Sequence, residues 1–209
     1  MPLGNHASKK PSGWRRVISP AAAPSGSRTD TDVAPGTSAG LAILGEYIFS
    51  AENDTVTSKE ALLDPYNDRV KLATGFLDVP LLRHTITDSH FKARDRMNRT
   101  LVFLARMLQD FHLHDARAIA IDERTAALME PDGKLRVAGL GHACFLRAQT
   151  LPVVCRAGLP LTMSGVKAYR AGAGDRFDTV KWTGLGGASY LLSVTAGVVT
   201  SNLPTGTIY

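Results

Sequence analysis

Apolar residues recur at regular spacings along most of the chain, and the spacing changes from one segment to the next. Met97, Leu101, Leu104, Leu108 and Phe111 follow one another at steps of four and three residues. This spacing places them on one face of a helix. It is the clearest helical pattern in the sequence, and it predicts a helix that begins near residue 97.

Strand-like segments stand on both sides of this helix. Residues 84–88 (HTITD) alternate threonine with isoleucine, which predicts a short strand. After the helix, the β-like segments are 116–122, 125–130, 135–140, 142–148, 166–170, 189–194 and 198–201. The apolar stretch LAILGEYIF, residues 41–49, predicts a further helix. The order of elements favours an α/β domain that ends in a mostly antiparallel β region.

The first 32 residues differ from the remainder. They are rich in proline, glycine, serine and alanine and show no sustained periodicity, which predicts a disordered or atypical N-terminal segment. We therefore place one domain at 33–209. The whole chain of 209 residues, 44% hydrophobic and 21% charged, is long enough for a single core.

Charge and cysteine content exclude several classes of protein. The formal net charge is +5, but the basic residues are scattered, which does not favour a nucleic-acid partner. No apolar run reaches the ~20 residues of a membrane span, and the start MPLGNHASKK has no secretory core, which predicts a cytoplasmic protein. Cys144 and Cys155 have no metal or redox spacing and are expected to be small buried residues.

A turn with the pattern Gly-x-Ser-x-Gly precedes the apolar stretch at residue 41. Gly36–Gly40 (GTSAG) fits a nucleophile elbow, in which small neighbours allow a sharp bend that exposes Ser38. The backbone N–H of Ala39 would then be available to an oxyanion. The pattern alone fits equally well a tight turn in which serine caps a helix.

A histidine follows the predicted strand at 84–88. His90 stands where open α/β sheets display functional groups. Three arginines crowd the first turns of the next helix, where positive charge opposes the helix dipole: Arg94, Arg96 and Arg99. A bound carboxylate would compensate for this charge. The alternative is that the arginines pair with carboxylates of the chain itself, those of Asp88, Asp95 or Asp110.

A pair of carboxylates follows the next predicted strand. Asp122 or Glu123 would be able to hold an imidazole in the correct tautomer, as the acid of a Ser-His-acid triad does. Alternation along the strand does not decide between them.

Together these motifs resemble the cyanophycinase family of serine peptidases. The resemblance rests on GTSAG, on DSHF followed by the arginines of RDRMNR, and on AIAIDERTA, with further elements such as ALLDPYND and the closing GTIY. It implies a flavodoxin-like or class I glutamine amidotransferase-like sheet. Its substrate would be cyanophycin, an aspartate backbone bearing arginine, or a related aspartyl peptide. The family's earlier βα units have no counterpart in residues 1–32, so we expect a chain that is incomplete at its N-terminus.

Carried over by motif, the resemblance assigns a catalytic triad. Ser38 matches the nucleophile, His90 the base and Glu123 the acid, with Ala39 at the oxyanion. The matching substrate-binding residues are Asp88, Ser89, Arg94, Arg96 and Arg99. Ser89 stands where the family commonly has glutamine. The resemblance implies no cofactor and no nucleic-acid or membrane partner, and we consider a homodimer as the assembly.

Three other interpretations compete with this one. The chain would be a non-catalytic remnant that binds acidic peptides through Arg94 and Arg96, or an esterase that uses Ser38 with a later histidine such as His142. The cluster His112-Leu-His114-Asp115 would fit a metal site, although histidines also suit the end of a helix.

Overall fold

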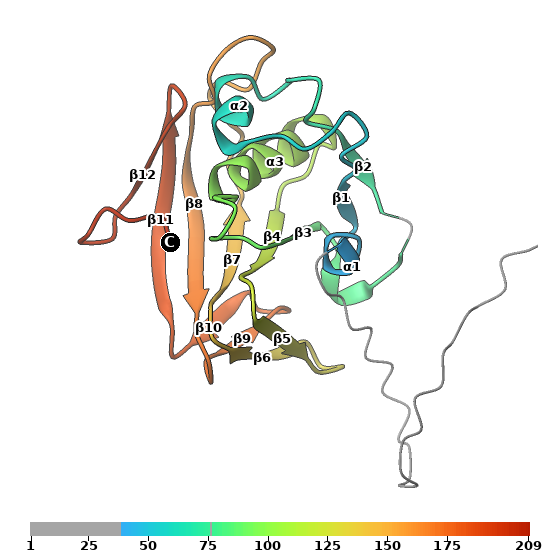
Figure 1. The fold of residues 1–209 in the computed structure, drawn as a ribbon, viewed down its shortest axis with the longest axis vertical. Helices are drawn as coiled ribbons and strands as arrows, with labels where there is room; N and C mark the ends of the chain where they lie inside the picture. The colour runs from blue at the N-terminus through green and yellow to red at the C-terminus, as the bar shows by residue number, and fades with distance from the viewer. Residues whose placement is uncertain (1–38, 76) are drawn as a thin grey trace, which may run out of the picture. The chain divides into compact units, whose positions relative to one another are not determined.

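The computed structural model describes residues 39–75 and 77–209, all within the unit that runs from Val33 to Tyr209. Their helical segments are α1 (Ala39–Ala42), α2 (Ser58–Leu63), the 3-10 turn η1 (Pro80–Leu82) and α3 (Met97–Asp110). The strands are β1 (Tyr47–Phe49), β2 (Leu72–Thr74), β3 (Thr85–Ser89), β4 (Ala116–Ile121), β5 (Thr125–Met129), β6 (Lys134–Gly139), β7 (Ala143–Ala148), β8 (Met163–Ala171), β9 (Arg176–Asp178), β10 (Thr183–Leu185), β11 (Ala188–Thr195) and β12 (Val198–Ser201). Figure 1 shows their arrangement.

The strands form two sheets. The larger has the order β12-β11-β8-β7-β4-β3-β1-β2, and the smaller has the order β10-β9-β6-β5. Within the larger sheet β1, β3 and β4 are parallel, whereas the strands from β4 to β12 pair antiparallel. The described residues therefore form an α/β fold with a mixed sheet and few helices, and the antiparallel C-terminal region predicted from the sequence is confirmed.

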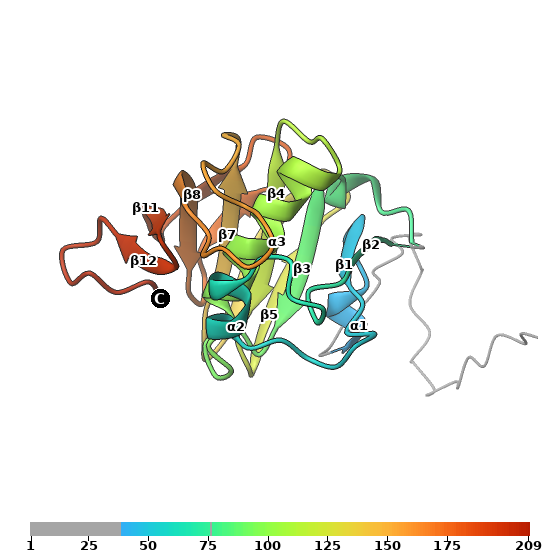
Figure 2. The same ribbon diagram turned by 90° about the horizontal axis from the view of Figure 1, so that it is seen from above.

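The two faces of strand β4 contribute to two different hydrophobic cores. Its alanines at 116, 118 and 120 belong to the core that contains α3, while Ile119 and Ile121 belong to the core that contains the smaller sheet. Because successive side chains of a strand point to opposite faces, one strand can serve both cores. The larger sheet is consequently the middle layer, with α2 and α3 on one face (Figures 1 and 2) and the smaller sheet on the other.

Most of the predicted elements are present. The helix predicted from residue 97 is α3, the segment 84–88 is β3, and the later β-like segments correspond to β4–β8, β11 and β12. The predicted helix over residues 41–49 is wrong: only α1 is helical, and the apolar stretch ends as β1. Between them Gly45 passes so close to β3 that a Cβ there would lie 2.4 Å from the carbonyl oxygen of Thr85.

Helix α2 was not predicted from the sequence. This helix carries a capping box, in which Thr57 accepts from the Glu60 backbone N–H and the Glu60 carboxylate accepts from the Thr57 backbone N–H. The pattern Thr-x-x-Glu before an apolar pair is a sequence signal for a helix start, so α2 was predictable.

Two further expectations concern the cysteines and the membrane. Cys144 and Cys155 are both unpaired and buried, and burial raises the pKa of each thiol to about 12. Both therefore stay protonated and act as small apolar side chains, as predicted.

Within the described residues, none of the helices has the length and hydropathy that a bilayer crossing requires.

Candidate functional site

The ends of two neighbouring parallel strands bring a histidine and a carboxylate together. In the register of β3 and β4, Ser89 lies opposite Ile121, so the residues that follow these positions meet at the same edge of the sheet. There the Nδ1 atom of His90 lies 2.7 Å from Oε1 of Glu123. The side chain of His90 is 24% exposed and that of Glu123 is 51% exposed. The contact is therefore open to solvent on its carboxylate side.

The backbone at His90 has an unusual conformation. Its φ is +50°, in the left-handed region that non-glycine residues seldom adopt. Residues held in this region cost free energy and are found preferentially at functional sites. Here the bend turns the chain directly out of β3, and the backbone N–H of the next residue, Phe91, donates to the carbonyl oxygen of Ile121 in β4. The imidazole is thus held at the end of the strand.

The structure distinguishes the two carboxylates that the sequence left equivalent. The carboxylate of Asp122 accepts two hydrogen bonds from the backbone. Its Oδ1 accepts one from the N–H of Lys92 at 2.9 Å, and its Oδ2 accepts one from the N–H of His142 at 3.0 Å. Glu123 extends instead to His90. Asp122 therefore ties the loop after β3 to the start of β7, and Glu123 alone of the two contacts the His90 imidazole.

The C-terminal residue, Tyr209, packs against the loop that follows β3. The ring of Tyr209 packs edge-on against buried Phe91, with 5.6 Å between the centroids. Its hydroxyl accepts from the backbone N–H of Met97 at the start of α3 and donates to Asp95. Burial raises the pKa of Tyr209, so the hydroxyl remains a donor at neutral pH. No local pattern indicates this contact, because it joins residues more than a hundred positions apart.

A buried carboxylate neutralises two of the three arginines. Asp88 accepts two bonds from Nη2 of Arg99, at 2.7 and 2.8 Å, one from Nε of Arg99 and one from Nη1 of Arg96. The side chains of Asp88, Arg96 and Arg99 are 6%, 14% and 5% exposed. Of the alternatives left open above, the pairing with Asp88 is therefore the one that the structure contains.

The remaining residues predicted to bind substrate differ in exposure. Ser89 is buried, and its carbonyl oxygen accepts from Arg96. Arg94 is exposed, and no ion pair of its side chain occurs within residues 39–75 and 77–209. Arg94 is thus the guanidinium on this loop that is open to a ligand, and Arg96 is partly accessible beside it.

Ser38 lies outside the described residues. Ala39 is the first residue of α1, a helix that is fixed to β3 because the Thr87 hydroxyl donates to the carbonyl oxygen of Leu41 at 2.5 Å. The helix that begins one residue after Ser38 in the sequence is therefore attached to β3, the strand that ends one residue before His90.

Comparison with known proteins identifies the relatives of this chain. Over 146 residues, 68% of the chain, it is 32% identical to the cyanophycinases of Trichormus variabilis and Nostoc sp.. It is 36% identical to the cyanophycinase of Synechococcus elongatus over 112 residues, 53% of the chain. This chain is cyanophycinase-like. It covers 44% of the length of the first two relatives and 30% of the third. No family model matches it.

His142 of the cyanophycinase-like chain lies near Asp122 rather than near Glu123. Its Nδ1 is 3.8 Å from Oδ2 of Asp122, beyond hydrogen-bonding distance, and its side chain is 45% exposed. The carboxylate of Asp122 is already occupied by two backbone N–H groups. Of the two histidines, His90 has the closer carboxylate contact.

The metal-like cluster at 112–115 has a different explanation. Asp115 bridges two arginines that face each other on β4 and β7, with 2.7 Å to Arg117 and 2.6 Å to Arg147. No group of three or more histidine, cysteine or acidic side chains within residues 39–75 and 77–209 is arranged to hold a metal ion. The carboxylate of this cluster is an ion-pair partner.

Replacing Asp115 should make the free energy of unfolding depend less on pH in the acidic range. Burial favours the neutral carboxyl, but hydrogen bonds from Arg147 and Arg117 outweigh it and lower the pKa of Asp115 below its ordinary 3.8. The stabilisation is then present above pH 3.8 and is lost as the pH falls through the folded-state pKa. We expect Asp115→Asn to lower the free energy of unfolding by about 2 kcal/mol at pH 7.

Urea denaturation across a pH series measures this effect. The difference between Asp115→Asn and the unmodified chain should shrink as the pH is lowered below 4. Asp68→Asn, a change at an exposed aspartate, is the control and should show no such trend. A difference that stays constant from neutral to acidic pH would contradict the assignment.

Proposed function

We propose that this chain carries the catalytic part of a serine-type peptidase that hydrolyses cyanophycin or a related aspartyl peptide. The observation that carries the proposal is the 2.7 Å contact between His90 Nδ1 and Glu123 Oε1 at the carboxyl ends of β3 and β4. A carboxylate on one ring nitrogen fixes the tautomer in which the other nitrogen can accept a proton. The relatives named cyanophycinase supply the reaction class.

The proposed mechanism is acyl transfer to serine. Ser38 Oγ attacks the scissile carbonyl carbon while Nε2 of His90 takes the hydroxyl proton, and Glu123 stabilises the resulting imidazolium. The C–N bond then breaks as the proton passes to the leaving amine. Water, activated by His90, releases the acyl group from Ser38. The backbone N–H of Ala39 is proposed to donate to the oxyanion. The reaction requires no cofactor.

Substrate binding is proposed to involve the arginine-rich loop. Arg94 is exposed, so its guanidinium would bind a carboxylate of the substrate, with Arg96 beside it. Asp88, Ser89 and Arg99 are buried and would act by holding this loop and the end of β3 in place. The proposed catalytic unit spans residues 33–209, with residues 1–32 as a separate N-terminal segment.

We also propose the type of sheet, the cellular location and the assembly of this chain. The parallel arrangement of β1, β3 and β4 supports a flavodoxin-like or glutamine amidotransferase-like sheet. A cytoplasmic location and a homodimer stay predictions from the sequence.

Covalent labelling tests the proposal directly. The purified chain should react with a fluorophosphonate probe, and peptide mapping should locate the adduct at Ser38. Ser38→Ala should abolish labelling, whereas Ser164→Ala, at an exposed serine with no proposed role in the site, should retain it. A chain that shows a cooperative unfolding transition and yet remains unlabelled would be a non-catalytic remnant, and the proposal would then be wrong.

A further inference from the structure

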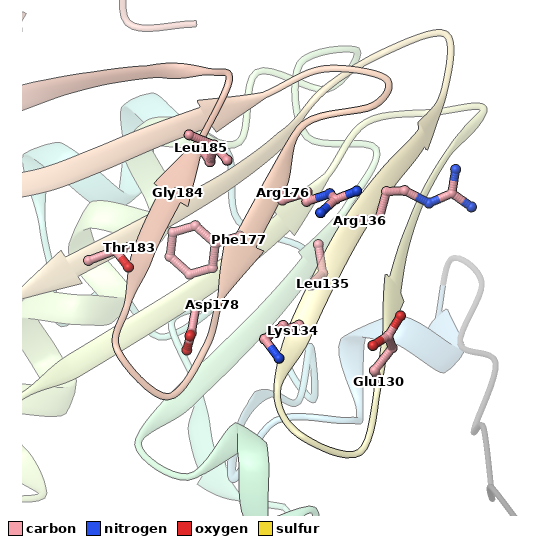
Figure 3. Close-up of a pocket in the computed structure, with 10 residues that line it drawn as sticks. All are labelled: Glu130, Lys134, Leu135, Arg136, Arg176, Phe177, Asp178, Thr183, Gly184 and Leu185. Atoms are coloured by element: carbon pink, nitrogen blue, oxygen red, sulfur yellow. The ribbon is translucent and has the colours of Figure 1, made fainter.

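The outer face of the smaller sheet carries two arginines directly opposite each other. In the antiparallel pairing of β6 and β9, Arg136 is the register partner of Arg176. Alternation along these strands turns Leu135, Val137 and Phe177 into the core and leaves both arginines exposed. Figure 3 shows the two side chains leaving neighbouring strands in the same direction. Two like charges are therefore held side by side, which is unfavourable unless an anion compensates for them.

Two other pairs of arginines in this chain have such an anion. Asp88 binds Arg96 and Arg99. Asp115 binds Arg117 and Arg147, which are also register partners on neighbouring antiparallel strands. In both cases one carboxylate accepts hydrogen bonds from two guanidiniums.

The pair formed by Arg136 and Arg176 has no corresponding carboxylate. Neither side chain forms an ion pair or a hydrogen bond with any residue in 39–75 or 77–209. The nearest acid on β9, Asp178, accepts from the backbone N–H groups of Val180 and Lys181 in the following turn. Its register partner on β6 is Lys134, so Asp178 belongs to the adjacent row of side chains.

The surroundings of the pair suit a ligand larger than a simple ion. A groove with a volume of about 380 Å³ runs along β6, β9 and β10 and includes both arginines (Figure 3). Across the four strands the row reads Leu128, Arg136, Arg176, Leu185, as given by the pairings of β5, β6, β9 and β10. The two leucines are 47% and 73% exposed. Apolar contacts are thus available on both sides of the paired charges.

We propose that this groove binds an acidic peptide, with an aspartate or glutamate carboxylate bridging Arg136 and Arg176 as Asp115 bridges Arg117 and Arg147. The planar guanidinium forks match a carboxylate geometrically. The neighbouring leucines contact apolar atoms of the peptide. This binding needs no bond cleavage and is independent of the proposed hydrolysis.

Fluorescence anisotropy with a labelled peptide of alternating aspartate and leucine tests the proposal. The measurement uses the full chain carrying Ser38→Ala and Arg94→Gln, so that the probe is neither consumed nor bound at the proposed active site. Adding Arg136→Gln and Arg176→Gln should weaken binding at least about tenfold. The control pair Arg156→Gln and Lys167→Gln removes the same charge from exposed positions elsewhere, and it should change the dissociation constant less than about twofold.

Further arms separate this groove from general charge attraction and from a structural role. Arg136→Lys keeps the charge but loses the fork, and it should still weaken binding several-fold with an unchanged melting temperature. An equal effect of the control pair, binding of the corresponding asparagine peptide, or full binding by Arg136→Lys would each overturn the proposal. Displacement of the peptide by inorganic phosphate at low ionic strength, with similar affinity, would reveal a simple anion site and would also overturn it.

Discussion

His90→Ala is expected to reduce amide hydrolysis by about six orders of magnitude, the size of loss found when a serine triad loses its base. His90 is the histidine whose imidazole contacts Glu123, at 2.7 Å, and no other side chain is proposed to take the serine proton. The effect should lie in kcat rather than in KM, because the imidazole acts on the reacting atoms and not on the remote parts of the substrate. Steady-state release of product from cyanophycin measures it.

The matched control is His142→Ala. His142 stands at the same edge of the sheet, next to a carboxylate, but its Nδ1 lies 3.8 Å from Asp122. The peptidase proposal expects this variant to keep its rate within about threefold of the parent, since no step of the mechanism uses the side chain. The esterase interpretation expects the reverse. Loss of activity in His142→Ala with activity retained in His90→Ala would therefore replace one mechanism by the other.

Glu123→Gln separates orientation from folding. Glutamine keeps the shape of the side chain, but it cannot stabilise the imidazolium as a carboxylate does. We expect a loss of kcat in the same direction as for His90→Ala, with an unchanged unfolding transition because the Glu123 side chain is half exposed. Asp122→Asn would differ, since its carboxylate accepts two backbone N–H groups and its loss should lower stability as well.

Local patterns were sufficient to predict α3, β3 and β4, although the fold buries more of each than a single face. Helix α3 was visible from the spacing of its large apolar residues, and β3 and β4 were visible from their small and β-branched residues. The stretch 41–49 was misjudged because a short continuous apolar run does not distinguish a helix from a buried strand. After the helix ends at Ala42, Gly45 passes close to the backbone of β3, and this contact joins segments forty residues apart.

The candidate site shows the same division between local and long-range information. The positions of His90 and Glu123 after their strands were readable, because parallel strands end at a common edge. The choice between Asp122 and Glu123 was not, since it depends on which backbone N–H groups the fold brings to each carboxylate. The opposition of Arg136 and Arg176 was likewise hidden, because the register of β6 against β9 joins segments that are forty residues apart.

The arginines of the loop after β3 illustrate a further limit. Their crowding at the start of α3 correctly indicated that a carboxylate was needed, but not whether it came from a ligand or from the chain. The structure supplies Asp88, from the preceding strand. The carboxylate and its two arginines are consequently part of the framework that holds His90, which connects the stability of this cluster to the candidate site.

Asp88→Asn is expected to lower the free energy of unfolding by about 3–5 kcal/mol, the range found when one partner of a buried ion pair is removed. Asparagine retains the size of the side chain but leaves the charges of Arg96 and Arg99 without their counter-ion, in a setting where Arg99 is only 5% exposed. Urea denaturation at pH 7 measures the loss, and Asp68→Asn, at an exposed aspartate, should stay within about 0.5 kcal/mol of the parent.

A double variant distinguishes the ion pair from simple loss of packing. Replacing Arg99 by methionine removes the buried positive charge, so Asp88→Asn should cost less in that background than in the parent, and the two changes should not add. Strict additivity would show that Asp88 and Arg99 stabilise the fold independently, and a loss below about 1 kcal/mol for Asp88→Asn would show that the cluster is solvated. Because β3 leads directly into His90, loss of the Asp88 carboxylate should disturb the candidate site first. As urea is raised, fluorophosphonate labelling of the parent and of Asp88→Asn should therefore diverge at a lower urea concentration than their global unfolding does.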